Sequence, residues 1–376
     1  MRARELGIEI GDGTPGPLNA ITDVPGVGIG HTTLIEGEGS LHVGSGPIRT
    51  GVTVIVPHAE VGTRPVFAGA HRLNGNGEMT GLEWVRESGM LTTPIALTNT
   101  HSVGVVRDAL VAADVNRRGA SEIFWSLPVV GETWDGMLND INGMHVRAGH
   151  VHDALEQATG GVPSEGGVGG GTGMICHDFK GGIGTASRVV SGAAGGFSVG
   201  VLVQANHGRR ERLTINGVGV GEEIGRDEVP FPEDSLPSDA SAAGSGMPGM
   251  SGAGSIIVVV GTDAPLLPHQ CERLAQRAGF GIARTGGVGE MTSGDLFLCF
   301  ATGNAGRLSN YKVGAEPVRL PLEMLSDLVI TEYYDAVIEA TEEAIVNALV
   351  AGATMTGRDG VTVHGLPNDR LAGLLN

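Results

Sequence analysis

The sequence predicts a mixed α/β fold, because two kinds of segment alternate along its 376 residues. Short runs rich in β-branched residues are typical of buried strands, and they cover 52–56, 94–97, 124–130, 197–205, 255–260 and 296–300. Longer stretches between them repeat apolar residues at helical spacing. Hydrophobic residues make up 41% of the chain and charged residues 18%, so the chain has enough apolar residues for a large core and is not expected to be largely disordered.

Three helical regions are expected. The first covers 100–117, where a polar cap precedes apolar residues one turn apart. The second covers 266–278 and has Pro268 near its first turn, a favourable position for proline. The third covers 322–351, with a break expected near Ile330. Its glutamates are expected to form a solvated face, and they are Glu339, Glu342 and Glu343.

The segment 221–254 does not fit this alternation. It is acidic at first and then rich in Pro, Ser, Ala and Gly, which predicts a flexible loop. A loop of this length inside a compact domain usually has a purpose, such as a lid, a linker or a processing site. It runs directly into the apolar run that begins at Ser255. The junction of Gly254 with Ser255 is therefore the main functional clue in the sequence.

A cleavage at this junction would give Ser255 its own catalytic base. A serine hydroxyl needs a base to act as a nucleophile, and a free α-amino group has a pKa of about 7.7–8.0. Attack of Ser255 Oγ on the Gly254 carbonyl, followed by hydrolysis of the ester, would expose that amine on the same residue. Gly254 suits such a bond because it lacks a Cβ. The alternative is an ordinary serine that opens a strand after a Gly-rich loop, and the dipeptide alone favours this alternative.

Nine blocks of sequence, spread over nearly the whole chain, carry a family resemblance. They are 19–28, 49–58, 77–82, 98–104, 138–143, 203–208, 254–260, 262–265 and 356–360. In this order they resemble the L-aminopeptidase/D-Ala-esterase/amidase family, which includes the bacterial β-aminopeptidases. The resemblance implies a four-layer α/β/β/α sandwich, similar to N-terminal-nucleophile hydrolases but with different strand connectivity. It also implies a single catalytic domain over 1–376, autoprocessed into an α chain (1–254) and a β chain (255–376), and a homo-oligomer of αβ units, commonly four.

The resemblance implies a role for each of five polar residues. Ser255 matches the nucleophile, and Asn206 matches the residue whose amide stabilises the oxyanion. Ser293 and Asp295 match a polar pair that supports the nucleophile, with Ser293 expected to bridge to Ser255 Oγ. Glu132 matches the residue that binds the free amino group of the substrate, which favours aminopeptidase over endopeptidase activity. Without the resemblance, these positions would be assigned to a turn, a strand end and a surface glutamate.

Trp134 departs from the pattern of the family. Some members have a tyrosine there, whose hydroxyl acts near the oxyanion, whereas an indole offers only an N–H donor and more bulk. Trp134 is therefore expected to shape the substrate pocket and to favour a pocket of the β-aminopeptidase type. The sequence does not choose between L-α-, D- and β-aminoacyl substrates, because modest apolar differences in a pocket give limited discrimination.

Three other motifs allow competing functions. Residues 196–200 match the G-x-S-x-G pattern around Ser198, but the apolar run that follows predicts a strand instead of a nucleophile elbow. The Gly-rich stretch 167–173 lacks the Lys-Ser/Thr of a phosphate-binding loop and is expected to pack closely. Residues 150–153 contain two histidines and an aspartate, which are expected to open a solvated helix more readily than to bind metal. A further alternative is an uncleaved, Gly-rich binding or structural protein.

Composition limits the partners and the setting. The net charge of −18 argues against a nucleic-acid partner. Cys176, Cys271 and Cys299 lie far apart, which indicates reduced thiols and a cytoplasmic setting. No apolar stretch of signal-peptide or membrane-spanning type is evident. We expect no cofactor and no metal, and we expect substrates that are small peptides, amides or esters with a free amine.

Overall fold

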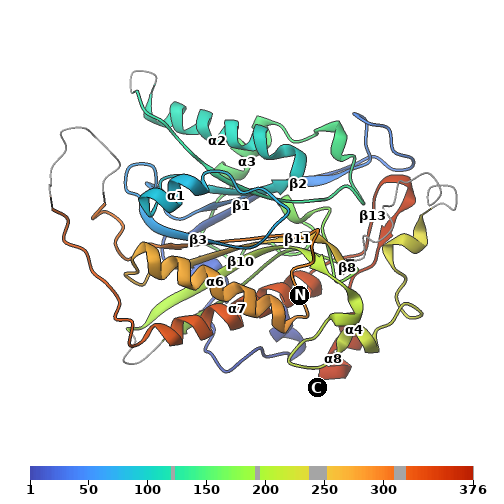
Figure 1. The fold of residues 1–376 in the computed structure, drawn as a ribbon. Helices are drawn as coiled ribbons and strands as arrows, with labels where there is room; N and C mark the ends of the chain where they lie inside the picture. Colours follow the sequence, from blue (N-terminus) through green and yellow to red (C-terminus); the bar gives the residue numbers. More distant parts are fainter. Residues whose placement is uncertain (120–122, 191–194, 237–251, 309–318, 376) are drawn as a thin grey trace.

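The computed structural model describes residues 1–119, 123–190, 195–236, 252–308 and 319–375, and most of its strands form two sheets that pack face to face (Figure 1). The four-stranded sheet contains, in spatial order, β1 (Gly28–Glu36), β2 (Ile48–Val56), β5 (Ile95–Asn99) and β6 (Val129–Thr133). The six-stranded sheet contains β4 (Met90–Leu91), β3 (Val66–Gly75), β12 (Gly294–Ala301), β11 (Gly252–Thr262), β10 (Phe197–Gly208) and β9 (Gly182–Val190). Two small hairpins pair β7 (Ile175–Cys176) with β8 (Phe179–Lys180), and β13 (Met355–Thr356) with β14 (Thr362–Val363).

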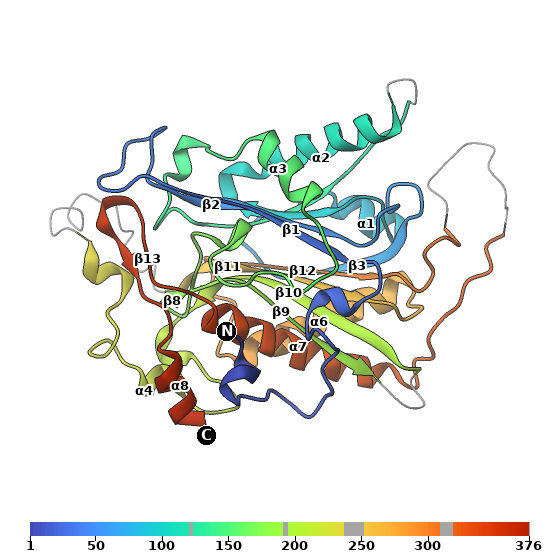
Figure 2. The same cartoon turned by 180° about the vertical axis from the view of Figure 1, so that it is seen from behind.

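Helices cover both outer faces, so the order of layers is α/β/β/α as expected (Figures 1 and 2). The outer layer on the four-stranded sheet is α2 (Val103–Arg118) and α3 (Ala148–Glu156). The outer layer on the six-stranded sheet is α6 (Pro268–Arg284) and α7 (Ile330–Val350). The shorter helices are α1 (Leu82–Ser88), α4 (Val220–Glu223) and α8 (Asn368–Leu375). None of the described helices is long and apolar enough to cross a membrane.

The central strand β11 shows why the two sheets stay together. Ile257 and Val259 point into the core between the sheets, whereas Ile256 and Val258 point towards the helices. All four side chains are fully buried, which explains the continuous apolar run in the sequence. Gln204 of β10 adds polar links across the sheets, because its Nε2 donates to Thr98 O (2.9 Å) and Thr133 Oγ1 (2.8 Å).

Several boundaries differ from the expectation. The strand expected at 124–130 is β6, which begins only at Val129, directly after Pro128, a residue without an N–H to donate to the sheet. The long helix begins at Ile330, where a break was expected, and not at 322. The prediction of a solvated glutamate face was wrong for Glu342 and Glu343. Both are buried, Glu343 is paired with Arg4 and Arg188, and Glu342 is paired with Arg284.

The loop expected at 221–254 falls partly outside the described residues, which leave out 237–251. In its described part, α4 ends at Glu223 and a 3₁₀ helix covers Pro232–Ser235. Strand β11 already begins at Gly252. The Gly254–Ser255 bond therefore lies inside a strand of the sheet, two residues beyond its first residue, and not at the boundary between loop and strand.

Candidate active site

Ser255 lies in β11 beside Asn206 of β10, and the two residues are direct partners in the antiparallel ladder. The Ser255 side chain is buried, and its Oγ accepts a hydrogen bond from the Gly294 N–H at 3.0 Å. Gly294 opens β12, which runs parallel to β11 on its other side. The serine hydroxyl is thus fixed between two neighbouring strands, and its oxygen already has one donor.

Gly254 packs directly against Asn206. A Cβ at position 254 would lie 1.9 Å from Asn206 O and 3.3 Å from Asn206 Nδ2. The first distance is an overlap with a backbone atom, so this position accepts only glycine without a shift of the strand. The second distance puts the amide of Asn206 next to the Gly254–Ser255 peptide bond.

The orientation of the Asn206 amide is fixed from both ends. Its Oδ1 accepts from the Ile175 N–H at 2.7 Å, and its Nδ2 donates to the Trp134 carbonyl at 3.0 Å. Because a backbone N–H can only donate, the oxygen of the amide must face Ile175. The Nδ2 then has one N–H in use and a second N–H available for another acceptor.

Ser293 and Asp295 form a hydrogen-bonded pair next to Ser255. Ser293 Oγ donates to Asp295 Oδ1 at 2.6 Å, and Asp295 is the ladder partner of Ile256. Burial raises the pKa of Asp295 to about 6, although hydrogen bonds from Ser293 and from the Ile256 N–H lower it. The expected bridge from Ser293 to Ser255 Oγ is not the hydrogen bond that this structure has. The donor to Ser255 Oγ is the Gly294 N–H, and the Ser293 hydroxyl is directed to Asp295.

Glu132 lies on β6, in the opposite sheet, and is 3% exposed. Its carboxylate accepts from the Glu78 N–H at 2.9 Å and from the Thr100 hydroxyl. Burial raises the pKa of Glu132, while these two hydrogen bonds lower it. Gly77 connects this group to the Ser255 environment, since a Cβ at Gly77 would lie 3.1 Å from Glu132 Oε1 and 3.2 Å from Gly294 Cα.

Trp134 contributes to this region through its backbone as much as through its ring. Its carbonyl holds the Asn206 amide, and its half-buried side chain packs against an apolar cluster that includes Met137, Leu138 and Met355. The ring is therefore placed as an apolar wall. A tyrosine hydroxyl would have offered a second polar group at this position.

The backbone donors and one buried polar cluster of the site were not predicted from the sequence. Gly294 and Ile175 act through N–H groups, which leave no mark in side-chain patterns. The cluster lies directly after β6, where Asp135 accepts from Asn139 Nδ2 at 3.1 Å and burial raises its pKa to about 6. Asn99 donates to Thr50 in the same cluster. The dense polar blocks at 98–104 and 138–143 were the available signal.

The competing motifs do not form sites in the described residues. Ser198 lies near the start of β10, within a strand, where a nucleophile elbow has no place. The stretch 169–171 packs so closely that a Cβ at Gly170 would lie 2.6 Å from Leu97 O. The histidines at 150 and 152 lie in α3 and belong to no group of potential metal ligands among the described residues. The group that the structure does bring together is Cys176, His177 and His207.

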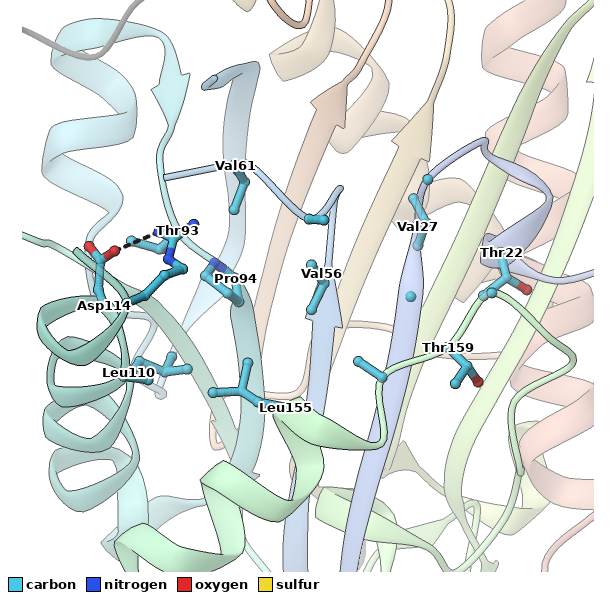
Figure 3. A pocket seen from close by; sticks show the side chains of 17 residues that line it. Thr22, Val27, Val56, Val61, Thr93, Pro94, Leu110, Asp114, Leu155 and Thr159 are labelled. Carbon is cyan, nitrogen blue, oxygen red and sulfur yellow. Dashed lines mark hydrogen bonds and ion pairs between the residues drawn. The ribbon is translucent and has the colours of Figure 1, made fainter. Parts of the chain in front are cut away.

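A cavity of about 610 Å³ lies at one end of the four-stranded sheet, and the side chains that line it are drawn in Figure 3. It is lined by residues at the start of β1, the end of β2 and the approach to β5, among them Val27, Val56 and Pro94. Glu132 lies near the last residue of β6, which is parallel to β5. The cavity is therefore at the opposite end of the four-stranded sheet from the carboxylate of Glu132.

Comparisons with known proteins show the family of the chain. A model of peptidase family S58 matches residues 19–363. The chain is 48% identical over 376 residues to the beta-peptidyl aminopeptidase BapA of Sphingosinicella microcystinivorans, with all of this chain and 91% of the relative covered. It is 45% identical over 378 residues to BapA of Sphingosinicella xenopeptidilytica, again with all of this chain and with 90% of the relative covered.

Two solved structures have the same fold. The beta-aminopeptidase of a Burkholderia species superimposes with a TM-score of 0.89 at 54% identity, covering 100% of this chain and 98% of the other. The L-aminopeptidase D-Ala-esterase/amidase of Ochrobactrum anthropi, described as a variant of the Ntn hydrolase fold, superimposes with a TM-score of 0.87 at 42% identity and the same coverage. The chain belongs to peptidase family S58 and is a serine-type aminopeptidase/amidase with an N-terminal-nucleophile hydrolase fold.

Proposed function

We propose that the chain cleaves its own Gly254–Ser255 bond and then uses Ser255 as an N-terminal nucleophile. The observation that carries this proposal is the position of three groups around one peptide bond. Gly254 packs on Asn206, the Asn206 amide lies beside the bond, and the Gly294 N–H donates to Ser255 Oγ. The electrophile, the nucleophile and a donor for the oxyanion are thus together before any substrate binds.

Self-cleavage proceeds through an ester. Ser255 Oγ attacks the Gly254 carbonyl carbon, the C–N bond breaks, and the hydroxyl proton ends on the leaving nitrogen. Water then hydrolyses the ester, which leaves a carboxylate on Gly254 and restores the Ser255 hydroxyl. The free N–H of Asn206 Nδ2 stabilises the negative oxygen that develops in both steps.

In the mature enzyme the new amine of Ser255 serves as the general base. It takes the proton of its own hydroxyl when Oγ attacks the substrate carbonyl, and it later returns a proton to the leaving amine. Asp295, hydrogen-bonded to Ser293, holds the ammonium form of that amine. Glu132 binds the amino group of the substrate, because a buried carboxylate whose present partners are neutral gains most from a cation.

We propose N-terminal β-aminoacyl residues of short peptides and amides as the substrate class. Two relatives named as beta-peptidyl aminopeptidases are 48% and 45% identical, and the beta-aminopeptidase structure is 54% identical. The L-aminopeptidase D-Ala-esterase/amidase at 42% identity supports L-α-aminoacyl and D-alanyl substrates as the second candidate. The apolar ring of Trp134 supports the first choice, since it offers no hydroxyl to the oxyanion.

We further propose that the two fragments form an αβ unit and that these units assemble into a homo-oligomer, four units being the first arrangement to test. The setting we propose is the cytoplasm, which is supported by three buried cysteines, all of them free. Light scattering of the purified protein measures the oligomeric state directly.

The decisive experiment is intact-mass analysis with N-terminal sequencing of the purified chain. We expect fragments 1–254 and 255–376 for the natural sequence and one uncut chain for Ser255→Ala. Turnover of β-alanyl, L-α-aminoacyl and D-alanyl p-nitroanilides then ranks the substrate classes. Full activity in material that stays uncut would refute the mechanism, and a Ser198→Ala variant with unchanged turnover excludes the conventional serine hydrolase.

A further inference from the structure

Three potential metal ligands meet on the face of the six-stranded sheet that is turned towards the helices. Cys176 ends β7, His177 follows it in the turn to β8, and His207 lies on β10. All three are buried, and one ligand atom from each lies within 4.8 Å of the others. No metal was expected from the sequence, in which the cysteines lie far apart, but the partners of Cys176 are histidines brought to it by the fold.

The hydrogen bonds of the histidines leave a nitrogen on each ring without a partner. His177 Nδ1 donates to the Arg209 carbonyl at 2.9 Å, so His177 Nε2 carries a lone pair, and this buried atom has no hydrogen-bond partner in the described part of the chain. His207 Nε2 is also buried without a partner among the described residues, but the His207 nitrogen that faces Cys176 Sγ, at 3.8 Å, is Nδ1. A buried polar atom without a partner is unusual, and an ion is one of the standard explanations for His177 Nε2.

The spacing of Cys176 Sγ and His207 Nδ1 fits a cation held by sulfur and nitrogen. Zn²⁺ binds thiolate sulfur at about 2.3 Å and imidazole nitrogen at about 2.0–2.1 Å, which separates these two ligand atoms by about 3.6 Å in a tetrahedral site. The observed 3.8 Å between Cys176 Sγ and His207 Nδ1 is close to that value.

We propose that Cys176, His177 and His207 form a binding site for a thiophilic cation, with Zn²⁺ as the type ion. The ligand atoms are Cys176 Sγ, His177 Nε2 and His207 Nδ1. On binding, the S–H bond of Cys176 breaks, its proton leaves to solvent, and a metal–thiolate bond forms without any change of oxidation state. The soft thiolate selects Zn²⁺ over Mg²⁺ and Ca²⁺, which prefer oxygen ligands.

A small cavity of about 10 Å³ reaches the proposed site at one of its ligands, His207. It is lined by His207 together with Arg209, Glu290, Ser293 and Asp295. Arg209 and Glu290 form an ion pair whose side chains are 36% and 20% exposed, so one end of the cavity lies close to solvent. The cavity therefore lies between the surface and the ring of His207.

A cation here would join the two segments that hold Asn206. Ile175, which donates to Asn206 Oδ1, directly precedes Cys176, and His207 directly follows Asn206. The His177 N–H donates to the His207 carbonyl at 2.8 Å, so one backbone hydrogen bond already joins the two segments. An effect of the cation on catalysis rests on the proposed role of Asn206. If Asn206 has that role, Zn²⁺ should change kcat more than KM. The binding of the cation does not depend on that role.

Cobalt titration of chelator-treated protein tests the site. The Ser255→Ala variant is used first, because it lacks the proposed nucleophile and separates metal binding from activity. We expect one equivalent of Co²⁺ to produce thiolate-to-cobalt charge-transfer absorption in the near ultraviolet, and Zn²⁺ to abolish that absorption by displacement. The same titration of the unsubstituted protein, with kcat and KM measured before and after Zn²⁺, tests the consequence for Asn206.

Variants identify the ligands. Cys176→Ser should lose the absorption, whereas Cys271→Ala and Cys299→Ala, which change the other two buried free thiols, should keep it. If circular dichroism shows that Cys176→Ser does not fold, His177→Gln takes its place and should lower cobalt affinity at least about tenfold. The absence of charge-transfer absorption in the folded Ser255→Ala protein, or unchanged absorption in both ligand variants, would overturn the proposal.

Discussion

Asp295 shows how one buried carboxyl group can set the pH range of a reaction. Burial raises the pKa of Asp295 to about 6, so near that pH the side chain changes from a neutral acid to a carboxylate. The carboxylate accepts the hydrogen bond of the Ser293 hydroxyl. In the unfolded chain the pKa of Asp295 has its ordinary value of 3.8, and the folded protein therefore binds more protons between pH 3.8 and about pH 6. This group stabilises the fold fully below about pH 4, and its contribution is lost as the pH rises to about 6.

Self-cleavage should slow as the pH falls through about 6, because only the ionised Asp295 can hold the developing ammonium of Ser255. After cleavage that ammonium lowers the pKa of Asp295, so peptide hydrolysis should keep its activity to lower pH than self-cleavage does. Both rates are measured between about pH 4.5 and about pH 8. Asp295→Asn should remove the decrease of the rate at low pH, together with most of the activity.

The control for this experiment is Asp263→Asn, just beyond the far end of β11, where burial also raises the pKa of an aspartate. It should leave both pH profiles unchanged. If the rates of self-cleavage and of peptide hydrolysis fell at the same acidic pH, this result would contradict the proposed contact between Asp295 and the new amine.

Asn206 has a donor and an acceptor with separate partners, so two substitutions distinguish its roles. Asn206→Ala should lower kcat by about 10²–10³ with little change in KM, since it removes the oxyanion donor. Asn206→Asp keeps an acceptor for the Ile175 N–H but loses the Nδ2 donor, and it should be impaired to a similar degree. An aspartate variant with nearly full kcat would mean that the residue only positions its neighbours.

At the level of elements, the sequence was sufficient where burial alone determines a strand. β10, β11 and β12 were predicted because their side chains are apolar on both faces. β9 was missed because it contains Thr185 and Arg188, which are buried through distant partners. Thr185 Oγ1 donates to Val201 O, and Arg188 is paired with Glu339 of α7. Such partners come from tertiary structure. The same is true in the candidate site, where the Gly294 N–H donates to Ser255 Oγ.

The contact between β9 and α7 depends on Gly184. A Cβ there would lie 1.9 Å from Ala344 O and 2.7 Å from Ala348 N, both backbone atoms of the helix. Gly184→Ala should therefore push α7 off the sheet and destabilise the fold by about 1–3 kcal/mol or more, measured by urea unfolding. Gly279→Ala in α6 is the matched control. Its Cβ would meet its nearest side chains at 3.8 Å, and it should stabilise by up to about 1 kcal/mol.

At the scale of the whole molecule, the proposed cleavage would divide the sheet between two chains. The order β3-β12-β11-β10 places β12 and most of β11, which belong to 255–376, between two strands from 1–254. β12 pairs with β3 along nearly its whole length, and β11 pairs with β10 from Thr262 back to Gly252. α7, also from the C-terminal part, packs on β9 from the N-terminal part. Neither fragment therefore retains a complete core.

The two fragments should stay together after cleavage and unfold together. Separating them would expose both faces of the inner strands and the unpaired edges of β3 and β10, at a cost comparable to unfolding the domain. We expect co-elution in gel filtration at micromolar concentration and a single thermal transition that coincides by fluorescence and by far-ultraviolet dichroism. Denaturant should be needed to separate the fragments, and isolated 255–376 should not fold alone. Two separate transitions, or release of 255–376 under native conditions, would show that the shared sheet is not what holds the mature protein together.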